Sequence, residues 1–202
     1  MMILGIGLIG GVVINFFFIG LLYLLNNKIT SVQELEKITT LPVLGAIPVT
    51  TYLTSSPFHV IENPKSVLSE AIRTLRTNLD FFLAGGNKKV IAISSTISGE
   101  GKSFLALNLG GVLALSRKKV VLLDLDMRKA KSNLPFVIAD ESQGISTILI
   151  QKNTWKECLI KTSLENFDYL AAGPQPPNPS ELLLNGEFSN LLEELKEHYD
   201  YI

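Results

Sequence analysis

The chain has 202 residues, of which 47% are hydrophobic, and its formal net charge is −1. This length allows one globular domain and a smaller appendage, and the charge gives no support for a nucleic-acid partner, which usually requires a basic face. The single cysteine, Cys158, excludes an internal disulfide and any metal site built from several thiolates. We interpret it as a small apolar side chain, consistent with a reducing compartment.

The first predicted element is a membrane-spanning helix over residues 2–25, which read MILGIGLIGGVVINFFFIGLLYLL and carry no charge. About 20 apolar residues cross a bilayer as a helix. A buried core helix is rarely this long and uncharged, and a signal peptide would have a basic start and a small-residue cleavage site. Lys28 and Lys37 follow the run, which favours a cytoplasmic location for the rest of the chain.

Residues 26–62 are interpreted as a juxtamembrane linker. Within it, Ser31 and Glu34 have the spacing of a capping box and predict a short helix. His59 in the linker and His198 near the end of the chain have no Cys, His or acidic residues at metal-ligand spacing. We therefore expect both histidines on the solvated surface.

A longer helix is predicted to open at Asn63 and Pro64, since proline suits the first helical turn, and to end at Gly85 and Gly86. Its apolar residues recur at helical spacing: Val67, Ala71, Ile72, Leu75, Leu79 and Phe82. The same helix carries EAIRTLR, with charges at Glu70, Arg73 and Arg76. Spacing alone favours a solvated face with a weak Glu70–Arg73 pair.

The remainder alternates between strand and helix patterns. Short runs rich in β-branched or apolar residues predict buried strands, and longer apolar-striped runs predict helices. The expected strands are 88–95, 120–126, 167–173 and a fourth that starts at 200–202; the expected helices are 102–116 and one or two over 179–199, broken near Gly186. Strands separated by helices indicate an α/β fold with a parallel sheet flanked by helices.

The junction between the first of these strands and the helix after it has the parts of a phosphate-binding loop. The strand over residues 90–94 leads into the loop 96–101, and Lys102 and Ser103 open the helix. Such a loop wraps an anion with backbone N–H groups at the positive end of the helix dipole, the lysine reaches the terminal phosphates and the hydroxyl ligates Mg²⁺. Thr96 replaces the first glycine of the usual G-x-x-x-x-G-K-[ST] pattern.

This loop predicts a P-loop NTPase fold that binds ATP with Mg²⁺. Gly99 and Gly101 let the backbone curl tightly and approach the phosphates without a Cβ in the way. The predicted nucleotide-binding residues are Thr96, Ser98, Gly99, Glu100, Gly101, Lys102, Ser103 and Phe104.

The run VVLLDLDMR adds Asp124, Asp126 and Arg128 at the end of the strand predicted over 120–126. In a parallel α/β sheet the ligand lies beyond the carboxyl ends of the strands, so both carboxylates are expected beside the phosphate loop. Strand alternation points them to one side. Carboxylate oxygens are ligands that Mg²⁺ prefers, and the predicted metal ligands are Ser103, Asp124 and Asp126.

Together these motifs resemble the bacterial tyrosine kinases that are part of polysaccharide co-polymerases. The resemblance covers nearly the whole chain in order: the apolar N-terminal run, LPVLGAIP, EAIRTLR, STISGEGKS, VVLLDLDMR, PPNPSELL and YDYI. It implies ATP-dependent protein-tyrosine autokinase activity that regulates capsular or exopolysaccharide polymerisation and export. The catalytic residues that it implies are Lys102, Asp124, Asp126 and Arg128, with Asp124 assisting proton removal from a tyrosine or holding the metal.

The resemblance also bears on partners and location. Glu70, Arg73 and Arg76 match the family's E-x-x-R-x-x-R motif, which implies a ring of identical subunits in which one subunit phosphorylates its neighbour. The expected location is the bacterial inner membrane, with the kinase domain, residues 63–202, in the cytoplasm. The expected partners are the polysaccharide polymerase and export machinery. The family's Walker B aspartate and tyrosine-rich tail do not occur in the sequence, so we interpret the chain as a C-terminally truncated fragment that transfers little phosphate alone.

Two other functions remain open. A membrane-linked partitioning-type ATPase would have a lysine early in the loop, in a K-G-G-x-G-K pattern, where this chain has Ile97. A non-catalytic scaffold that determines polysaccharide chain length would need neither the intact loop nor the paired aspartates.

Overall fold

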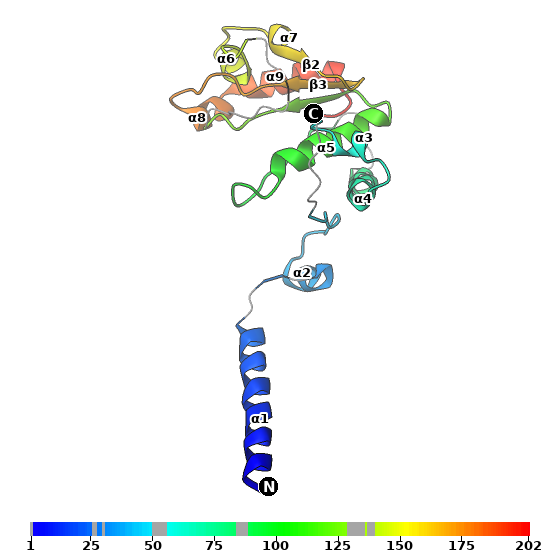
Figure 1. Cartoon of the computed structure of the whole chain (residues 1–202). Coiled ribbons are helices and arrows are strands. Elements are labelled where there is room, and N and C mark those ends of the chain that lie inside the picture. Colours follow the sequence, from blue (N-terminus) through cyan, green and yellow to red (C-terminus); the bar gives the residue numbers. More distant parts are fainter. Residues whose placement is uncertain are drawn as a thin grey trace. The chain divides into compact units, whose positions relative to one another are not determined.

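The computed structural model describes residues 2–25, 28–29, 31–49, 56–83, 89–128, 136 and 140–202. It divides into two units, Met1–Val43 and Leu44–Ile202. The first unit contains α1 (Met2–Leu24) and α2 (Val32–Ile38) (Figure 1). In α2 the Ser31 hydroxyl accepts a hydrogen bond from the Glu34 N–H at 3.2 Å, so the predicted cap of this short helix is confirmed.

The predicted membrane-spanning helix over residues 2–25 corresponds to α1, which is 23 residues long. Among the residues that the structure describes, no helix reaches the length and apolar character needed to cross a bilayer. The membrane span thus stays a prediction, as do the domain boundaries at residues 25 and 62.

The second unit is an α/β domain. Its helices and strands, in chain order, are α3 (His59–Glu62), α4 (Val67–Phe82), α5 (Lys102–Leu115), β1 (Val120–Leu123), α6 (Ile145–Leu149), α7 (Trp155–Cys158), β2 (Leu159–Lys161), β3 (Phe167–Leu170), α8 (Pro179–Leu184) and α9 (Gly186–His198). The predicted helix break near Gly186 is confirmed, because Asn185 separates α8 from α9.

The sheet has the order β1-β3-β2. β1 and β3 are parallel, with Val120 opposite Phe167 and Leu123 opposite Leu170, whereas β2 and β3 are antiparallel. The prediction of a purely parallel sheet is therefore wrong. The connection from β2 to β3 spans only residues 162–166, which suits a hairpin but is too short for a parallel crossover.

The strand predicted over residues 88–95 is only partly present. Lys88 lies outside the described residues. Lys89 forms an isolated parallel bridge with Tyr201, and the Ile91 N–H donates to the Ile202 carbonyl at 2.8 Å. Residues 92–95 have no ladder partner in the part of the chain that the structure describes, so the predicted strand does not continue through them.

The two faces of the sheet pack into different cores, as strand alternation requires. Val120, Leu122 and Phe167 contact the core formed with α4 and α5, and Val121 and Leu170 contact the core formed with α6 and α9. Helix α5 approaches the first face closely at Gly110, where an added Cβ would lie 2.5 Å from the Phe167 ring. Helix α4 packs beside α5 (Figure 1).

Helix α4 begins later than predicted. Ser66 caps it by accepting the Ser69 N–H at 3.1 Å, so Asn63 and Pro64 precede the helix. Its core-facing apolar residues are Leu68, Ile72, Leu75 and Leu79. Val67, which we expected on the inner face, is 78% exposed, because the helix starts at this residue with Leu68, not Val67, facing α5.

His59 is 1% exposed, so the prediction that it lies on the solvated surface is wrong. Its ring packs against Phe104 at a centroid distance of 6.3 Å, and its Nε2 contacts the Ser66 hydroxyl at 3.2 Å. The segment is buried because Asn108 of α5 holds it: the Asn108 side chain accepts the Val60 N–H at 3.0 Å. His198 is exposed, as predicted.

Candidate nucleotide-binding site

The loop between residues 95 and 102 has the backbone of an anion-binding turn. Gly99 and Gly101 have φ values of 93° and 87°, a left-handed conformation that only glycine adopts without strain. In the part of the chain that the structure describes, nothing lies within 4 Å of a Cβ added to either glycine, so the backbone conformation is the reason that glycine is required there. The prediction of a glycine-dependent turn is confirmed.

Gly101 is the N-cap of α5, and no side chain among the described residues caps this end. The first-turn N–H groups, including those of Lys102 and Ser103, have no intrahelical partner, and they lie at the positive end of the dipole of a 14-residue helix. Lys102 is half-buried and Ser103 is exposed. This helix end therefore has the donors and the charge that a phosphate requires.

The side chain of Glu100 is hydrogen-bonded to the backbone of its own loop. Its Oε2 accepts the N–H groups of Thr96 at 3.1 Å and of Ile97 at 3.2 Å. The carboxylate thus satisfies the first two N–H groups of the loop, including that of the threonine that replaces the usual first glycine. Sequence reasoning placed Glu100 among the ligand contacts but gave no signal for this bond within the loop.

Phe104, also predicted to contact the nucleotide, is half-buried and packs against the core beneath α5. Its carbonyl accepts a hydrogen bond from the Asn108 side chain at 2.9 Å. In this structure Phe104 anchors the first turn of α5. Ser98 is exposed in the turn of the loop.

Asp124 follows β1 directly and is held by β3. Its backbone N–H donates to the Leu170 carbonyl at 2.9 Å, and its Oδ2 accepts the hydroxyl of Tyr169 at 3.1 Å. Its Oδ1 accepts the backbone N–H of Asp126 at 3.1 Å. Asp124 is two residues beyond Leu122, which packs in the α4–α5 core, so alternation places its side chain on the α5 face of the sheet.

Tyr169 is a residue of this site that sequence reasoning missed. It is 2% exposed, and its ring packs against Phe136 at 5.0 Å between centroids. Burial, together with the charge of Asp124 and the hydrogen bond to it, raises the pKa of Tyr169 well above its usual value. The phenol therefore stays protonated and donates to the carboxylate. Only the β1–β3 register, which sets Tyr169 opposite Leu122, could have indicated this contact.

Asp126 is half-buried beside Asp124, and Arg128 is exposed and donates to the Ser180 hydroxyl of α8 at 3.3 Å. Among the described residues, no group of three or more His, Cys, Asp or Glu side chains could hold a metal ion alone. A nucleotide-bound Mg²⁺ needs only one or two carboxylates, because phosphates and water supply its other ligands. The donor set of Ser103, Asp124 and Asp126 fits that arrangement.

The charges of EAIRTLR differ in their surroundings. Arg73 pairs with Glu70 at 2.5 Å and also donates to the Pro64 carbonyl at 2.6 Å. Arg76 contacts the Ser116 hydroxyl at the end of α5 and lies 3.8 Å from the Asp80 carboxylate. Its side chain is therefore engaged within its own chain.

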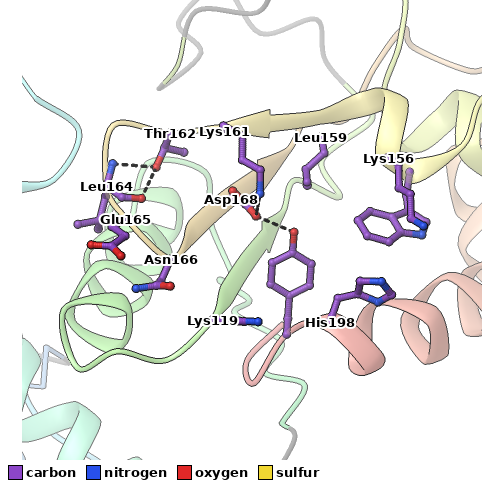
Figure 2. A pocket seen from close by; sticks show the side chains of 12 residues that line it. Lys119, Lys156, Leu159, Lys161, Thr162, Leu164, Glu165, Asn166, Asp168 and His198 are labelled. Carbon is purple, nitrogen blue, oxygen red and sulfur yellow. Dashed lines mark hydrogen bonds and ion pairs between the residues drawn. The ribbon is translucent and has the colours of Figure 1, made fainter.

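A separate cavity of about 440 Å³ lies under the β2–β3 hairpin (Figure 2). At its centre Asp168 accepts hydrogen bonds from Lys161 and from the Tyr199 hydroxyl, both at 2.7 Å. Lys119 and Asn166, which line it, directly precede β1 and β3. The cavity is thus at the amino ends of the parallel strands, whereas Asp124 is at a carboxyl end, where such sheets bind ligands.

Comparisons with known proteins show which proteins the chain is similar to. Residues 88–202 match the family model described as an AAA domain. CapB of Staphylococcus aureus is 39% identical over 149 residues, which cover 74% of this chain and 65% of CapB. The tyrosine-protein kinase YwqD of Bacillus subtilis is 37% identical over 139 residues, which cover 69% of this chain and 58% of YwqD.

The fold also matches a solved structure, the kinase domain of the Escherichia coli tyrosine kinase ETK. The TM-score is 0.76 and the identity 29%, over 85% of this chain and 70% of the ETK chain. The chain therefore belongs to the AAA domain family and, within it, to the bacterial tyrosine kinases. It spans less than two thirds of the length of the curated relatives CapB and YwqD.

Proposed function

We propose that the protein is an ATP-dependent tyrosine autokinase that uses Mg²⁺. The observation that carries the proposal is the glycine-dependent turn at the N-terminus of α5, on the face of the sheet where Asp124 lies. That pairing of a phosphate cradle with a carboxylate suits phosphoryl transfer, in which catalysis is mainly positioning and charge neutralisation. Kinship with tyrosine kinases supports the choice of acceptor.

Each residue of the site has a distinct task in this proposal. The backbone of Gly101 and the side chain of Lys102 bind phosphate oxygens, and the Ser103 hydroxyl and the Asp124 carboxylate hold Mg²⁺. The metal neutralises charge on the transferred phosphoryl group when it is bound. Asp124 also accepts the proton of the attacking tyrosine hydroxyl, and Asp126 supports the metal through water.

We further propose that α4 joins identical subunits into a ring. The exposed Glu70–Arg73 pair lies on the outer side of α4, where a second copy can reach it. Because Arg76 contacts Ser116 and Asp80 of its own chain, we assign it to holding α4 against α5. In the assembled protein, a subunit phosphorylates its neighbour and so regulates polysaccharide polymerisation and export.

The location that we propose is the bacterial inner membrane, with residues 63–202 in the cytoplasm where ATP is present. The exposed surface of α1 supports an apolar environment, since Phe16 and Phe17 are both 73% exposed. Burying such side chains in lipid removes apolar area from water. Residues 26–62 then form the juxtamembrane linker, whose last part, α3, packs against α5 of the domain.

The kinase proposal is tested with Lys102→Met in the full-length protein, with Lys118→Met as the matched control. Lys118 is an exposed lysine in the turn after α5. We expect Lys102→Met to abolish autophosphorylation from radiolabelled ATP and to weaken binding of a fluorescent ATP analogue at least tenfold, while Lys118→Met behaves as the wild type. Autophosphorylation that persists in Lys102→Met would remove the loop from the reaction and leave the scaffold function.

A further inference from the structure

The sheet register brings Tyr169 and Asp124 together on one face. Tyr169 is opposite Leu122 in the parallel pair of β1 and β3, and paired residues of neighbouring strands project to the same side. Asp124 is two residues after Leu122 and projects to that side as well. The phenol of Tyr169 therefore reaches diagonally across to the carboxylate, where the hydroxyl and Oδ2 are 3.1 Å apart.

We propose that Tyr169 is a positioning residue for phosphoryl transfer: its hydroxyl fixes the orientation of the Asp124 carboxylate. This inference rests on the proposed function of Asp124. Donors meet the carboxylate from two directions: the Tyr169 hydroxyl donates to Oδ2 and the Asp126 N–H donates to Oδ1. Together they define the plane of the group.

The alternative is that Tyr169 serves only as a core side chain. Its ring fills space against Phe136, and phenylalanine would fill that space equally well. The hydroxyl, however, is buried, and a buried hydroxyl without a partner is costly. Asp124 is the partner that the structure gives it. A core role and a positioning role thus differ in one atom, which a Tyr169→Phe variant removes while it keeps the ring.

The chain offers a matched control in Tyr199. Its hydroxyl donates to the carboxylate of Asp168 at 2.7 Å, and Tyr199 is as buried as Tyr169 to within a few per cent. That pair lies at the opposite end of the strands from Asp124. Tyr199→Phe therefore removes the same kind of hydrogen bond outside the candidate site.

The experiment measures autophosphorylation rates of the full-length protein at varied ATP with saturating Mg²⁺, alongside urea unfolding of each variant. For Tyr169→Phe we expect kcat to fall about tenfold, with KM for ATP within twofold of the wild type. For Tyr199→Phe we expect a similar loss of stability but an unchanged kcat. An unchanged kcat in Tyr169→Phe, or an equal fall in Tyr199→Phe, overturns the inference.

Asp124→Asn separates this inference from the proposed function. If Asp124→Asn transfers phosphate at the wild-type rate, the proposed role of Asp124 fails. If it is inactive and Tyr169→Phe is normal, only the positioning role fails. Where Asp124→Asn retains measurable activity, the double variant Asp124→Asn, Tyr169→Phe should have a kcat within twofold of that of Asp124→Asn, because the carboxylate that Tyr169 positions is absent from both. A further tenfold fall in kcat in the double variant counts against the inference. This last comparison holds even if Tyr169→Phe lowers the stability of the fold.

Discussion

Asn108 offers a direct measure of how firmly the segment before α4 is attached to the helix of the phosphate loop. The side chain is fully buried and bonds to the Val60 N–H at 3.0 Å, the Phe104 carbonyl at 2.9 Å and the Pro57 carbonyl at 3.4 Å. Asn108→Ala leaves the buried Val60 N–H without a partner, which costs about 1–3 kcal/mol, and removes two further bonds worth about 0.5–1.5 kcal/mol each.

The expected net loss is about 3 kcal/mol, because alanine's helix propensity returns about 0.5 kcal/mol. This is a large share of a typical stability of about 5–15 kcal/mol. For a domain of this size it corresponds to a fall in Tm of roughly 6–12 °C. Urea unfolding followed by circular dichroism measures it as a lower midpoint with an unchanged slope.

Asn153→Ala is the control for this measurement. The structure shows no hydrogen-bond partner for the buried Oδ1 of Asn153 among the residues that it describes. Truncating that side chain should therefore cost less than about 1 kcal/mol. If Asn108→Ala loses no more stability than Asn153→Ala, the side chain does not attach the segment to α5 and the reasoning is refuted.

Three further predictions concern assembly, location and pH. The double variant Arg73→Ala, Arg76→Ala should be a monomer in light scattering, and a ring that persists in this variant would contradict the role of α4 in assembly. Arg76→Ala alone should lower the free energy of unfolding. Deleting residues 2–25 should move the protein from the alkaline-washed membrane pellet to the supernatant, and retention in the pellet would argue against the span. Burial raises the pKa values of Tyr169 and Tyr199 above the usual value near 10, so the unfolded chain releases protons that the folded chain keeps. The contribution of these tyrosines to the free energy of unfolding should be fully present below about pH 10 and should fall above it by up to about 1.4 kcal/mol per pH unit for each tyrosine. In urea unfolding between pH 9 and 11, the free energy of unfolding of Tyr199→Phe should fall less steeply with pH than that of the wild type.

The parts of the site that the sequence predicted are those set by local chemistry. A left-handed turn needs Gly99 and Gly101 whatever surrounds it, and a helix that starts at Lys102 follows from the apolar run after it. The apolar run 120–123 likewise predicts a strand from its own composition, and the structure has β1 there. Asp124 could be placed at the strand end by the same reasoning.

What the sequence did not predict depends on partners distant in the chain. His59 is buried because α5 and Ser66 surround it, and no nearby residue signals this. β2 has three residues and exists because β3 pairs with it. The contact between Tyr169 and Asp124 depends on the register of two strands that are 45 residues apart at that contact, which hydrophobic patterning leaves undetermined.

The close approach of α5 to β3 at Gly110 limits how a bound nucleotide can act on the protein. Because Gly110 has no side chain, the backbone of α5 packs directly against the Phe167 ring. The helix therefore cannot move closer to the sheet without a steric clash. A phosphate arriving at Lys102 therefore meets donors already in place, and little of its binding energy is lost to rearranging the helix. Any movement that follows hydrolysis or transfer should appear in the loop ahead of the helix, while the helix itself stays fixed.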